Sequence, residues 1–190
     1  FEISNFYRAE NSHTGRHLTE FTSIDIEAAF MDYTDVMNVL ESLIIEVYKF
    51  VSENCKKEQE MIEHTIEVPS APFERITYKQ CIEELKQAGE KVEFGDDLMD
   101  AHLRIIGTNH PGFYFLTDWP MSLKPFYIRE KDDDPTLSRS FDLQFGYLEL
   151  SSGGTRLHDS ELLKNRLKEQ GLDPAQFVDH LKTFDWGMPP

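Results

Sequence analysis

An alternation of apolar and polar residues near the C-terminal third constrains the fold of this chain most strongly. It runs through residues 141–145 and, after Gly146, resumes over residues 147–150. Successive side chains of a strand point to opposite faces, so this pattern places one face of each segment in a core. Glycine readily adopts the backbone conformation of a tight bend. The sequence therefore predicts an antiparallel hairpin, or a bulged pair of strands, that turns at Gly146.

Other segments have strand patterns as well. Residues 1–10 and 20–30 are rich in aromatic and β-branched residues, and a polar stretch separates them, which predicts an antiparallel hairpin with a long loop. Residues 113–117 form an aromatic run typical of a buried strand, and residues 124–128 are expected to be extended.

Helical periodicity begins at Thr34, which is the expected N-cap of a helix that ends near residue 54. Its expected buried stripe is Val36, Leu40, Leu43, Val47 and Val51. Residues 55–77 are charged and contain two prolines, which predicts a connector. Further helices are expected over 78–88, ended by Gly89, over 98–106, from Asp159 or Ser160 to Gln170, and from Asp173-Pro174 to Lys182.

This mixture of antiparallel strands and interspersed helices predicts an α+β fold. The composition, with 39% apolar and 28% charged residues, is that of a folded globular chain. No apolar run approaches the roughly 20 residues that span a bilayer, and no signal peptide is evident. Cys55 and Cys81 are expected to be buried free thiols in a reducing cytosol. The net charge of −16 argues against a broad basic face for nucleic acid.

The first hairpin carries a candidate nucleotide site. Arg8 and Glu10 lie at the end of its first strand, Arg16 and His17 lie in its loop, and Phe21 lies on the return strand. Cations beside an aromatic ring suit a triphosphate and its stacked base. A surface hairpin whose charges are solvated is the alternative.

The second hairpin carries a candidate cation site. Asp142, Glu149 and Ser152 offer the hard oxygen ligands that Mg²⁺ prefers when phosphates complete its shell. Simple alternation puts Glu149 and Ser152 on opposite faces, so a shared site requires a distortion, which we expect within residues 151–154. Acidic residues on an exposed strand face are the alternative.

The small residues that follow are expected to let a ligand approach the backbone, and Arg156 is suited to bind a carboxylate through its planar fork. The seven histidines show no metal-ligand spacing, and neither a phosphate-binding glycine loop nor a nucleophile elbow is present.

Together these segments resemble the catalytic domain of class II aminoacyl-tRNA synthetases, specifically the archaeal and eukaryotic aspartyl-tRNA synthetases. The resemblance covers nearly the whole chain and is weakest at residues 55–75. Residues 6–12 and 16–21, with Asp25, resemble the family's motif 2. The further matching segments, in the family's order, are 117–120, 124–127, 132–135, 140–143, 148–153 and 156–159.

The resemblance implies a role for each candidate residue. Arg8 would be catalytic and would bridge the ATP α-phosphate and the amino acid's carboxylate. ATP would contact Arg8, Glu10, Arg16, His17, Leu18, Phe21 and Glu149. Aspartate would contact Arg8, Ser152 and Arg156, and Mg²⁺ would be held by Asp142, Glu149 and Ser152.

The implied activity joins aspartate to ATP, forming aspartyl-adenylate and pyrophosphate, and then transfers the aspartyl group to the 3′ end of tRNA. The Lys-Pro-Phe-Tyr run at residues 124–127, where asparagine enzymes tend to have alanine directly before the phenylalanine, favours aspartate, as does the run at 156–159. The Gly154-Thr155 pair departs from the usual Ala-Gln. Two alternatives remain: a tRNA-independent paralogue related to asparagine synthetase, and a truncated non-catalytic chain that binds nucleotide.

The family's anticodon-binding barrel, motif 1, the Ser-Pro-Gln…Lys segment and motif 3 have no counterpart in residues 1–190. We therefore expect the chain to be the central part of a catalytic domain, an incomplete antiparallel sheet flanked by helices. The resemblance implies a cytoplasmic homodimer with ATP, Mg²⁺, aspartate and tRNA(Asp) as partners, without membrane or DNA binding.

Overall fold

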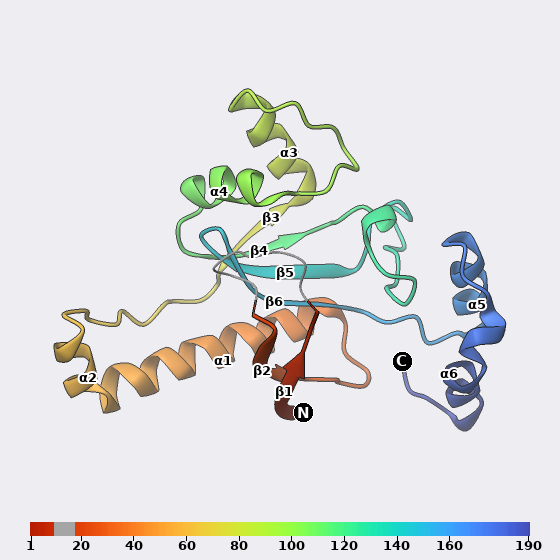
Figure 1. Cartoon of the computed structure of the whole chain (residues 1–190), viewed down its shortest axis with the longest axis horizontal. Coiled ribbons are helices and arrows are strands. Elements are labelled where there is room, and N and C mark those ends of the chain that lie inside the picture. The colour runs from red at the N-terminus through yellow and green to blue at the C-terminus, as the bar shows by residue number, and fades with distance from the viewer. Residues whose placement is uncertain (10–17) are drawn as a thin grey trace. The chain divides into compact units, whose positions relative to one another are not determined.

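The computed structural model describes residues 1–9 and 18–190 of the chain. It divides them into two compact units, Phe1–Phe30 and Met31–Pro190, and each is described by itself. Figure 1 labels the helices and strands. Within the described ranges, no helix has both the length and the apolar character needed to cross a membrane.

The first unit is the predicted antiparallel hairpin. Strand β1 spans Glu2–Tyr7 and strand β2 spans Glu20–Asp25, so both are shorter than the sequence pattern suggested. Phe6 and Phe21 are paired across the strands, and their ring centroids lie 6.1 Å apart. Such a cross-strand aromatic pair stabilises this pairing of the two strands.

The second unit contains a four-stranded sheet in the order β3-β4-β5-β6. Its strands are β3 (Glu74–Thr77), β4 (Phe113–Thr117), β5 (Ser140–Phe145) and β6 (Leu148–Gly154). The hairpin that turns at Gly146 and the strand at 113–117 are confirmed. Strands β4, β5 and β6 are antiparallel neighbours, but β3 is parallel to β4 and lies inside the segment expected to be a connector. The α+β fold is confirmed, with a mixed sheet.

The long helix α1 spans Tyr33–Asn54, and its N-cap is Asp32, not Thr34. The Asp32 carboxylate accepts a hydrogen bond of 2.7 Å from the Tyr33 N–H, and Asp35 accepts one of 2.9 Å from the Asp32 N–H. Both residues thus satisfy backbone N–H groups at the start of the helix. The prediction of Thr34 was wrong because a threonine and an aspartate two positions apart are both good N-caps.

The remaining helices follow the predicted order, with local differences. Asp159 caps α5 as expected, and the last predicted helix is divided into short helical pieces. In the segment expected to be extended, residues 124–128, Lys124 is extended and Ile128 forms a β-bridge, but Phe126 and Tyr127 form a turn. An additional helix α2 lies in the expected connector. The helical elements are α2 (Lys56–Met61), α3 (Tyr78–Gln87), α4 (Asp100–Asn109), η1 (Met121–Leu123), α5 (Ser160–Glu169), η2 (Pro174–Phe177), α6 (Val178–Lys182) and η3 (Thr183–Trp186).

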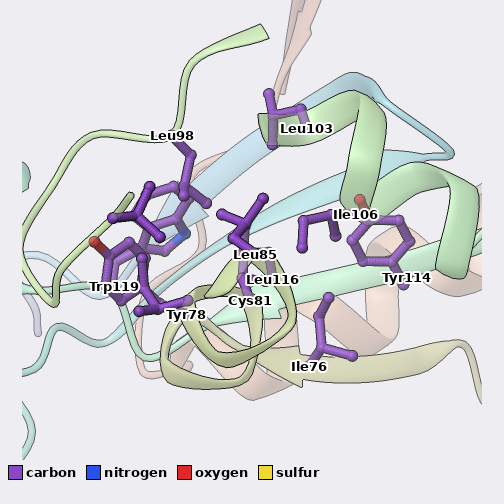
Figure 2. Packing of buried hydrophobic residues seen from close by; sticks show 12 residues of the cluster. Ile76, Tyr78, Cys81, Leu85, Leu98, Leu103, Ile106, Tyr114, Leu116 and Trp119 are labelled. Atoms are coloured by element: carbon purple, nitrogen blue, oxygen red, sulfur yellow. The ribbon is translucent and has the colours of Figure 1, made fainter. Parts of the chain in front are cut away.

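Alternating side chains of β4 enter two separate cores. Tyr114 and Leu116 pack with α3 and α4 on one face of the sheet, as Figure 2 shows. Phe115 packs on the other face against α1. In α1, Met37 is buried, whereas Val47, part of the expected stripe, is 48% exposed. The buried face of α1 is therefore rotated about the helix axis relative to the predicted face.

A third cluster lies at the end of the sheet where α5 and α6 are found (Figure 1). Its buried residues are Leu157, Leu163 and Leu181, and the partly buried Phe126 and Tyr127 pack against them. Both cysteines are free, but only Cys81 is buried; Cys55, at the end of α1, is partly exposed.

Candidate functional site

A pocket of about 370 Å³ opens on the face of the sheet that carries α3 and α4. Alternation along β5 places Phe141 and Leu143 in the core with α1, so the intervening polar side chains turn toward the pocket. Its lining includes Asp97, Leu98, Leu103, Trp119, Leu123, Lys124, Pro125, Tyr127, Ile128, Ser140, Asp142, Gln144, Glu149, Ser152, Gly153, Gly154 and Arg156. Four of the predicted site residues, Asp142, Glu149, Ser152 and Arg156, are therefore brought together.

A β-bulge in β6 makes this grouping possible. Leu143 pairs with Ser151 and Gln144 pairs with Glu149, so Leu150 is the extra residue of the bulge. The extra residue shifts the alternation and turns Glu149 and Ser152 toward the same pocket. The sequence predicted the need for a distortion but placed it within residues 151–154, one position too late.

Asp142 is the most deeply buried acid of the pocket, with 6% of its surface exposed. Burial raises its pKa to about 7; the nearby Lys124 lowers that pKa, and Glu149 raises it. The Lys124 Nζ lies 3.5 Å from the Asp142 Oδ2. A buried carboxylate of this kind is stabilised by any further cation that the pocket binds.

Lys124 is a pocket residue to which the sequence assigned no binding role. Its Nζ lies 4.1 Å from the centroid of the Trp119 ring, and its side chain is 15% exposed. The available signal was the position of this lysine in a Lys-Pro-Phe-Tyr run after a tryptophan. The contribution of Lys124 to the pocket becomes evident only from the fold, in which this residue follows η1 and lines the pocket.

Arg156 is held at the pocket by the segment that carries Tyr127. Residue 156 forms an isolated antiparallel bridge with Ile128, and the Arg156 Cζ lies 4.4 Å from the centroid of the Tyr127 ring. The Arg156 side chain is exposed to solvent. The pocket therefore presents two cations, Lys124 and Arg156, each over an aromatic ring.

The two glycines of β6 permit close packing within the protein. A Cβ on Gly153 would lie 2.8 Å from the Phe141 Cζ, and one on Gly154 would lie 2.8 Å from the Arg139 carbonyl oxygen. We expected these small residues to admit a ligand. Although both line the pocket, neighbouring protein atoms already occupy the space beside them.

Asp142, Glu149 and Ser152 suit a cation that is shared with a phosphorylated ligand. They offer two carboxylates and a hydroxyl, the donors that Mg²⁺ accepts. No group of three or more His, Cys, Asp or Glu side chains within 1–9 and 18–190 could hold a metal ion. Oxygen atoms of a ligand would therefore have to complete the coordination shell.

The other predicted site residues belong to the N-terminal unit or lie outside the described ranges. The Arg8 Cζ lies 5.3 Å from the centroid of the Phe21 ring, and the Arg8 N–H donates a 2.9 Å hydrogen bond to the Thr19 carbonyl. Leu18 directly precedes this return segment. Glu10, Arg16 and His17 lie outside the residues that the structure describes.

Comparison with known proteins gives matches along the whole chain. The family model for class II tRNA synthetases (D, K and N) matches residues 1–190. The aspartate–tRNA(Asp/Asn) ligase of Methanothermobacter thermautotrophicus is 44% identical over 190 residues, and the aspartate–tRNA(Asp) ligase of Thermoplasma volcanium is 46% identical over 191. Each match covers 100% of this chain and 44% of the relative. The chain thus spans less than half the length of these relatives.

Solved structures of aspartyl- and asparaginyl-tRNA synthetases also match nearly the whole chain. The aspartyl-tRNA synthetase of Entamoeba histolytica matches with a TM-score of 0.89 and 33% identity, over 99% of this chain and 41% of that one. The asparaginyl-tRNA synthetase of Pyrococcus horikoshii in complex with asparaginyl-adenylate matches with a TM-score of 0.90 and 34% identity, over 99% and 44% of the two chains.

Proposed function

Because this chain belongs to the class II tRNA synthetases of the D, K and N group, we propose that it forms the aspartate-activating centre of an aspartate–tRNA ligase. The reaction joins the aspartate α-carboxylate to the α-phosphate of ATP and releases pyrophosphate. The aspartyl group of the adenylate then passes to the 3′ end of tRNA.

The charge pattern of the pocket carries this proposal. Lys124 and Arg156 line it together with the carboxylates of Asp97, Asp142 and Glu149. Free aspartate has an ammonium group and two carboxylates, so a pocket with both kinds of charge matches it. Asparagine has an amide in place of the second carboxylate and would leave one of the two cations less well compensated.

The predicted site residues have separate roles in binding aspartate and ATP. Arg156 and Lys124 bind the side-chain carboxylate, and Ser152 lies beside the substrate. Arg8 bridges the α-phosphate and the attacking carboxylate and stabilises the negative charge that develops during the attack. Phe21 stacks on adenine, while Glu10, Arg16, His17 and Leu18 complete the ATP contacts. Positioning and charge neutralisation accelerate the reaction, so no protein nucleophile is required.

Asp142, Glu149 and Ser152 would hold Mg²⁺, and the phosphates of ATP would supply its remaining oxygen ligands. The bound cation would supply neutralisation of the phosphate charge. It also accounts for the buried position of Asp142, because a carboxylate with 6% exposure is costly without a nearby positive charge. Lys124 supplies part of that charge at 3.5 Å.

The whole protein would act as a homodimer in the cytoplasm and would take tRNA(Asp) as its second substrate. The names of the two relatives above differ in the tRNA substrate, since one is a tRNA(Asp/Asn) ligase and the other a tRNA(Asp) ligase. The net charge of −16 in these 190 residues is consistent with tRNA binding mainly through another part of the protein.

The test is exchange of labelled pyrophosphate into ATP, measured on the full-length protein with aspartate, asparagine or no amino acid. Exchange that depends on aspartate supports the proposal, and exchange with asparagine alone contradicts it. Asparagine formed from aspartate, ATP and ammonia without tRNA would instead identify an amide-forming paralogue. Arg156→Ala should lower kcat/KM for aspartate by at least about tenfold while ATP binding is retained, since a bidentate contact is lost.

A further inference from the structure

His110, the C-cap of α4, contacts a carboxylate through each of its two ring nitrogens. Its Nδ1 lies 2.8 Å from the Glu74 Oε2, and its Nε2 lies 3.0 Å from the Glu84 Oε1. Glu74 is the first residue of β3, and Glu84 belongs to α3. The imidazole side chain is 12% exposed. One ring therefore joins three elements at the end of α4.

The hydrogen-bonding capacity of these groups requires a charged imidazole. An ionised carboxylate only accepts hydrogen bonds, whereas a neutral imidazole has one N–H donor and one acceptor nitrogen. Both carboxylates can therefore be bonded at the same time only when each ring nitrogen carries a proton. With a neutral ring, a nitrogen lone pair would face one of the carboxylates, and that hydrogen bond would be lost.

The other groups packed around the ring do not change charge near neutral pH. Tyr114 of β4 lies beside it, with ring centroids 5.4 Å apart, and the Tyr114 hydroxyl donates a 2.9 Å hydrogen bond to the Gly146 carbonyl. Burial raises the pKa of this hydroxyl, and burial raises the pKa of the Cys81 thiol in α3 to about 12. Neither group therefore loses its proton below about pH 9. The Asn109 amide, which donates a 2.8 Å hydrogen bond to the Glu84 Oε2, does not titrate.

The surroundings of His110 favour its protonated form. Burial lowers the pKa of His110, but the hydrogen bonds and charges of Glu84 and Glu74 outweigh burial, so this pKa is raised above its ordinary value of 6.5. The charge also lies at the C-terminal end of α4, where the helix dipole favours a cation. Because the pKa is higher in the folded state, the contribution of the ring to stability is complete below pH 6.5 and is lost as the pH rises through the folded value.

We propose that His110, Glu74 and Glu84 form a pH-sensitive switch, in which the imidazolium holds the C-terminal end of α4 to β3 and α3 and loss of a proton releases that end. The same helix carries Leu103, which lines the pocket, so the switch acts on an element of the pocket wall. This inference does not depend on the proposed function, because it concerns the attachment of a helix and not the reaction.

The test is hydrogen–deuterium exchange of the full-length protein, measured by mass spectrometry at about pH 6 and about pH 9. His110→Gln replaces the ring with a side chain that does not titrate. The amides of α4 should be protected about 5- to 20-fold better in the wild-type protein at the lower pH and equally, within about twofold, at the higher pH. This range is that of a charged hydrogen bond, reduced because Glu74 is half-exposed. Asp142 is present in both proteins, so its titration cancels.

Lys86→Gln is the control, because it breaks another ion pair of α3, the exposed 2.7 Å contact with Glu93. It should leave the protection of α4 unchanged at both pH values. A wild-type advantage over His110→Gln that is the same at both pH values would overturn the switch, since the ring would then act through packing alone. An equal pH-dependent effect of Lys86→Gln would also overturn it, since the cause would then be general charge.

A second measurement serves if His110→Gln does not fold. In the full-length protein with ¹⁵N-labelled histidines, the ring nitrogens of His110 should both be protonated at about pH 6 and should titrate with a midpoint above 6.5. Glu74→Gln, a substitution of a half-exposed residue, should lower this midpoint and thereby identify the signal. A midpoint at or below 6.5, or one that does not respond to Glu74→Gln, would overturn the proposal.

Discussion

At the scale of single residues, burial of Asp142 has a cost that depends on pH. Burial raises its pKa from 3.8 to about 7, so the folded protein binds this proton more tightly than the unfolded chain does. The unfolded state loses the proton near pH 4 and the folded state near pH 7. The contribution of Asp142 to the free energy of unfolding is therefore greatest below pH 4 and falls as the pH rises toward 7.

Asp142→Asn should remove this dependence. Between pH 4.5 and 7.5, the wild-type protein should lose roughly 2–4 kcal/mol of unfolding free energy relative to the variant, since each unit of pKa difference corresponds to about 1.4 kcal/mol. Urea unfolding at several pH values, without nucleotide or divalent cation, measures the difference. A difference between the two proteins that stays constant with pH would contradict the raised pKa.

Gly107 shows how a single missing side chain permits two elements to meet. A Cβ at this position of α4 would lie 2.5 Å from the Gly146 carbonyl carbon and from the Tyr147 nitrogen in the turn between β5 and β6. Alanine normally stabilises a helix by about 1 kcal/mol relative to glycine. Here the clash with backbone atoms is larger than that gain, because a backbone atom cannot move aside as the end of a side chain can.

Gly107→Ala should therefore lower the free energy of unfolding by roughly 2–4 kcal/mol, at or beyond the usual range for overpacking. Gly112→Ala is the matched control, because a Cβ there has no other atom within 4 Å, and its effect should stay within about 0.5 kcal/mol. Both are measured by chemical unfolding. Equal effects of the two substitutions would contradict the close approach of α4 to the turn.

At the scale of elements, Asp32 connects the start of α1 to the segment that carries Arg156. Its carboxylate caps the helix, accepts a hydrogen bond from the Thr155 hydroxyl and pairs with Arg139 at 3.2 Å. The Thr155 hydroxyl oxygen also accepts a 3.0 Å hydrogen bond from the Tyr33 N–H. One carboxylate thus joins residues more than one hundred positions apart in the sequence.

Asp32→Ala should cost about 2–3 kcal/mol of unfolding free energy, more than the typical 1 kcal/mol of a helix cap, because three partners lose their acceptor. Asp159→Ala is the control, since Asp159 caps α5 by accepting hydrogen bonds from the Glu161 and Leu162 N–H groups. It should cost about 1 kcal/mol. A loss for Asp32→Ala no larger than that for Asp159→Ala would show that the connection to Thr155 and Arg139 adds nothing.

At the scale of the whole molecule, the features that the sequence predicts well depend on local physics. The turn at Gly146, the cap at Asp159 and the strand at 113–117 each depend on a few neighbouring residues. Strand β3 has only four residues, and its parallel partner residues lie forty positions further along the chain, so no local pattern reveals it. The bulge at Leu150 depends on the partner strand in the same way.

In the candidate site too, some residues can be predicted from local sequence, whereas others depend on long-range packing. Asp142 and Arg156 stand in recognisable segments, so the amino-acid sequence predicts both as site residues, and both line the pocket. Lys124 has an extended backbone directly after η1, and its proximity to Asp142 becomes evident only when β5 and this segment are folded together. Residue types predict the chemistry of the pocket, but the long-range packing determines which of them face it.

The net charge of −16 affects the stability of the molecule as a whole. Like charges repel one another over distances comparable with the Debye length, about 10 Å at 0.1 M salt and about 3 Å at 1 M. Close pairs such as Lys131 with Asp118, 3.0 Å apart and only 22% exposed on each side chain, are screened much less. Added salt therefore removes more repulsion than attraction.

Raising NaCl from about 0.05 M to 0.5 M should increase the thermal midpoint by a few degrees, and most of the rise should occur below about 0.3 M, where the Debye length changes most. Differential scanning calorimetry at constant pH measures it. A general effect of salt on hydration would instead grow steadily with concentration, so a linear rise up to about 1 M would contradict the electrostatic explanation. A falling midpoint would show that the close ion pairs, and not the excess of acidic residues, dominate the electrostatic free energy of folding.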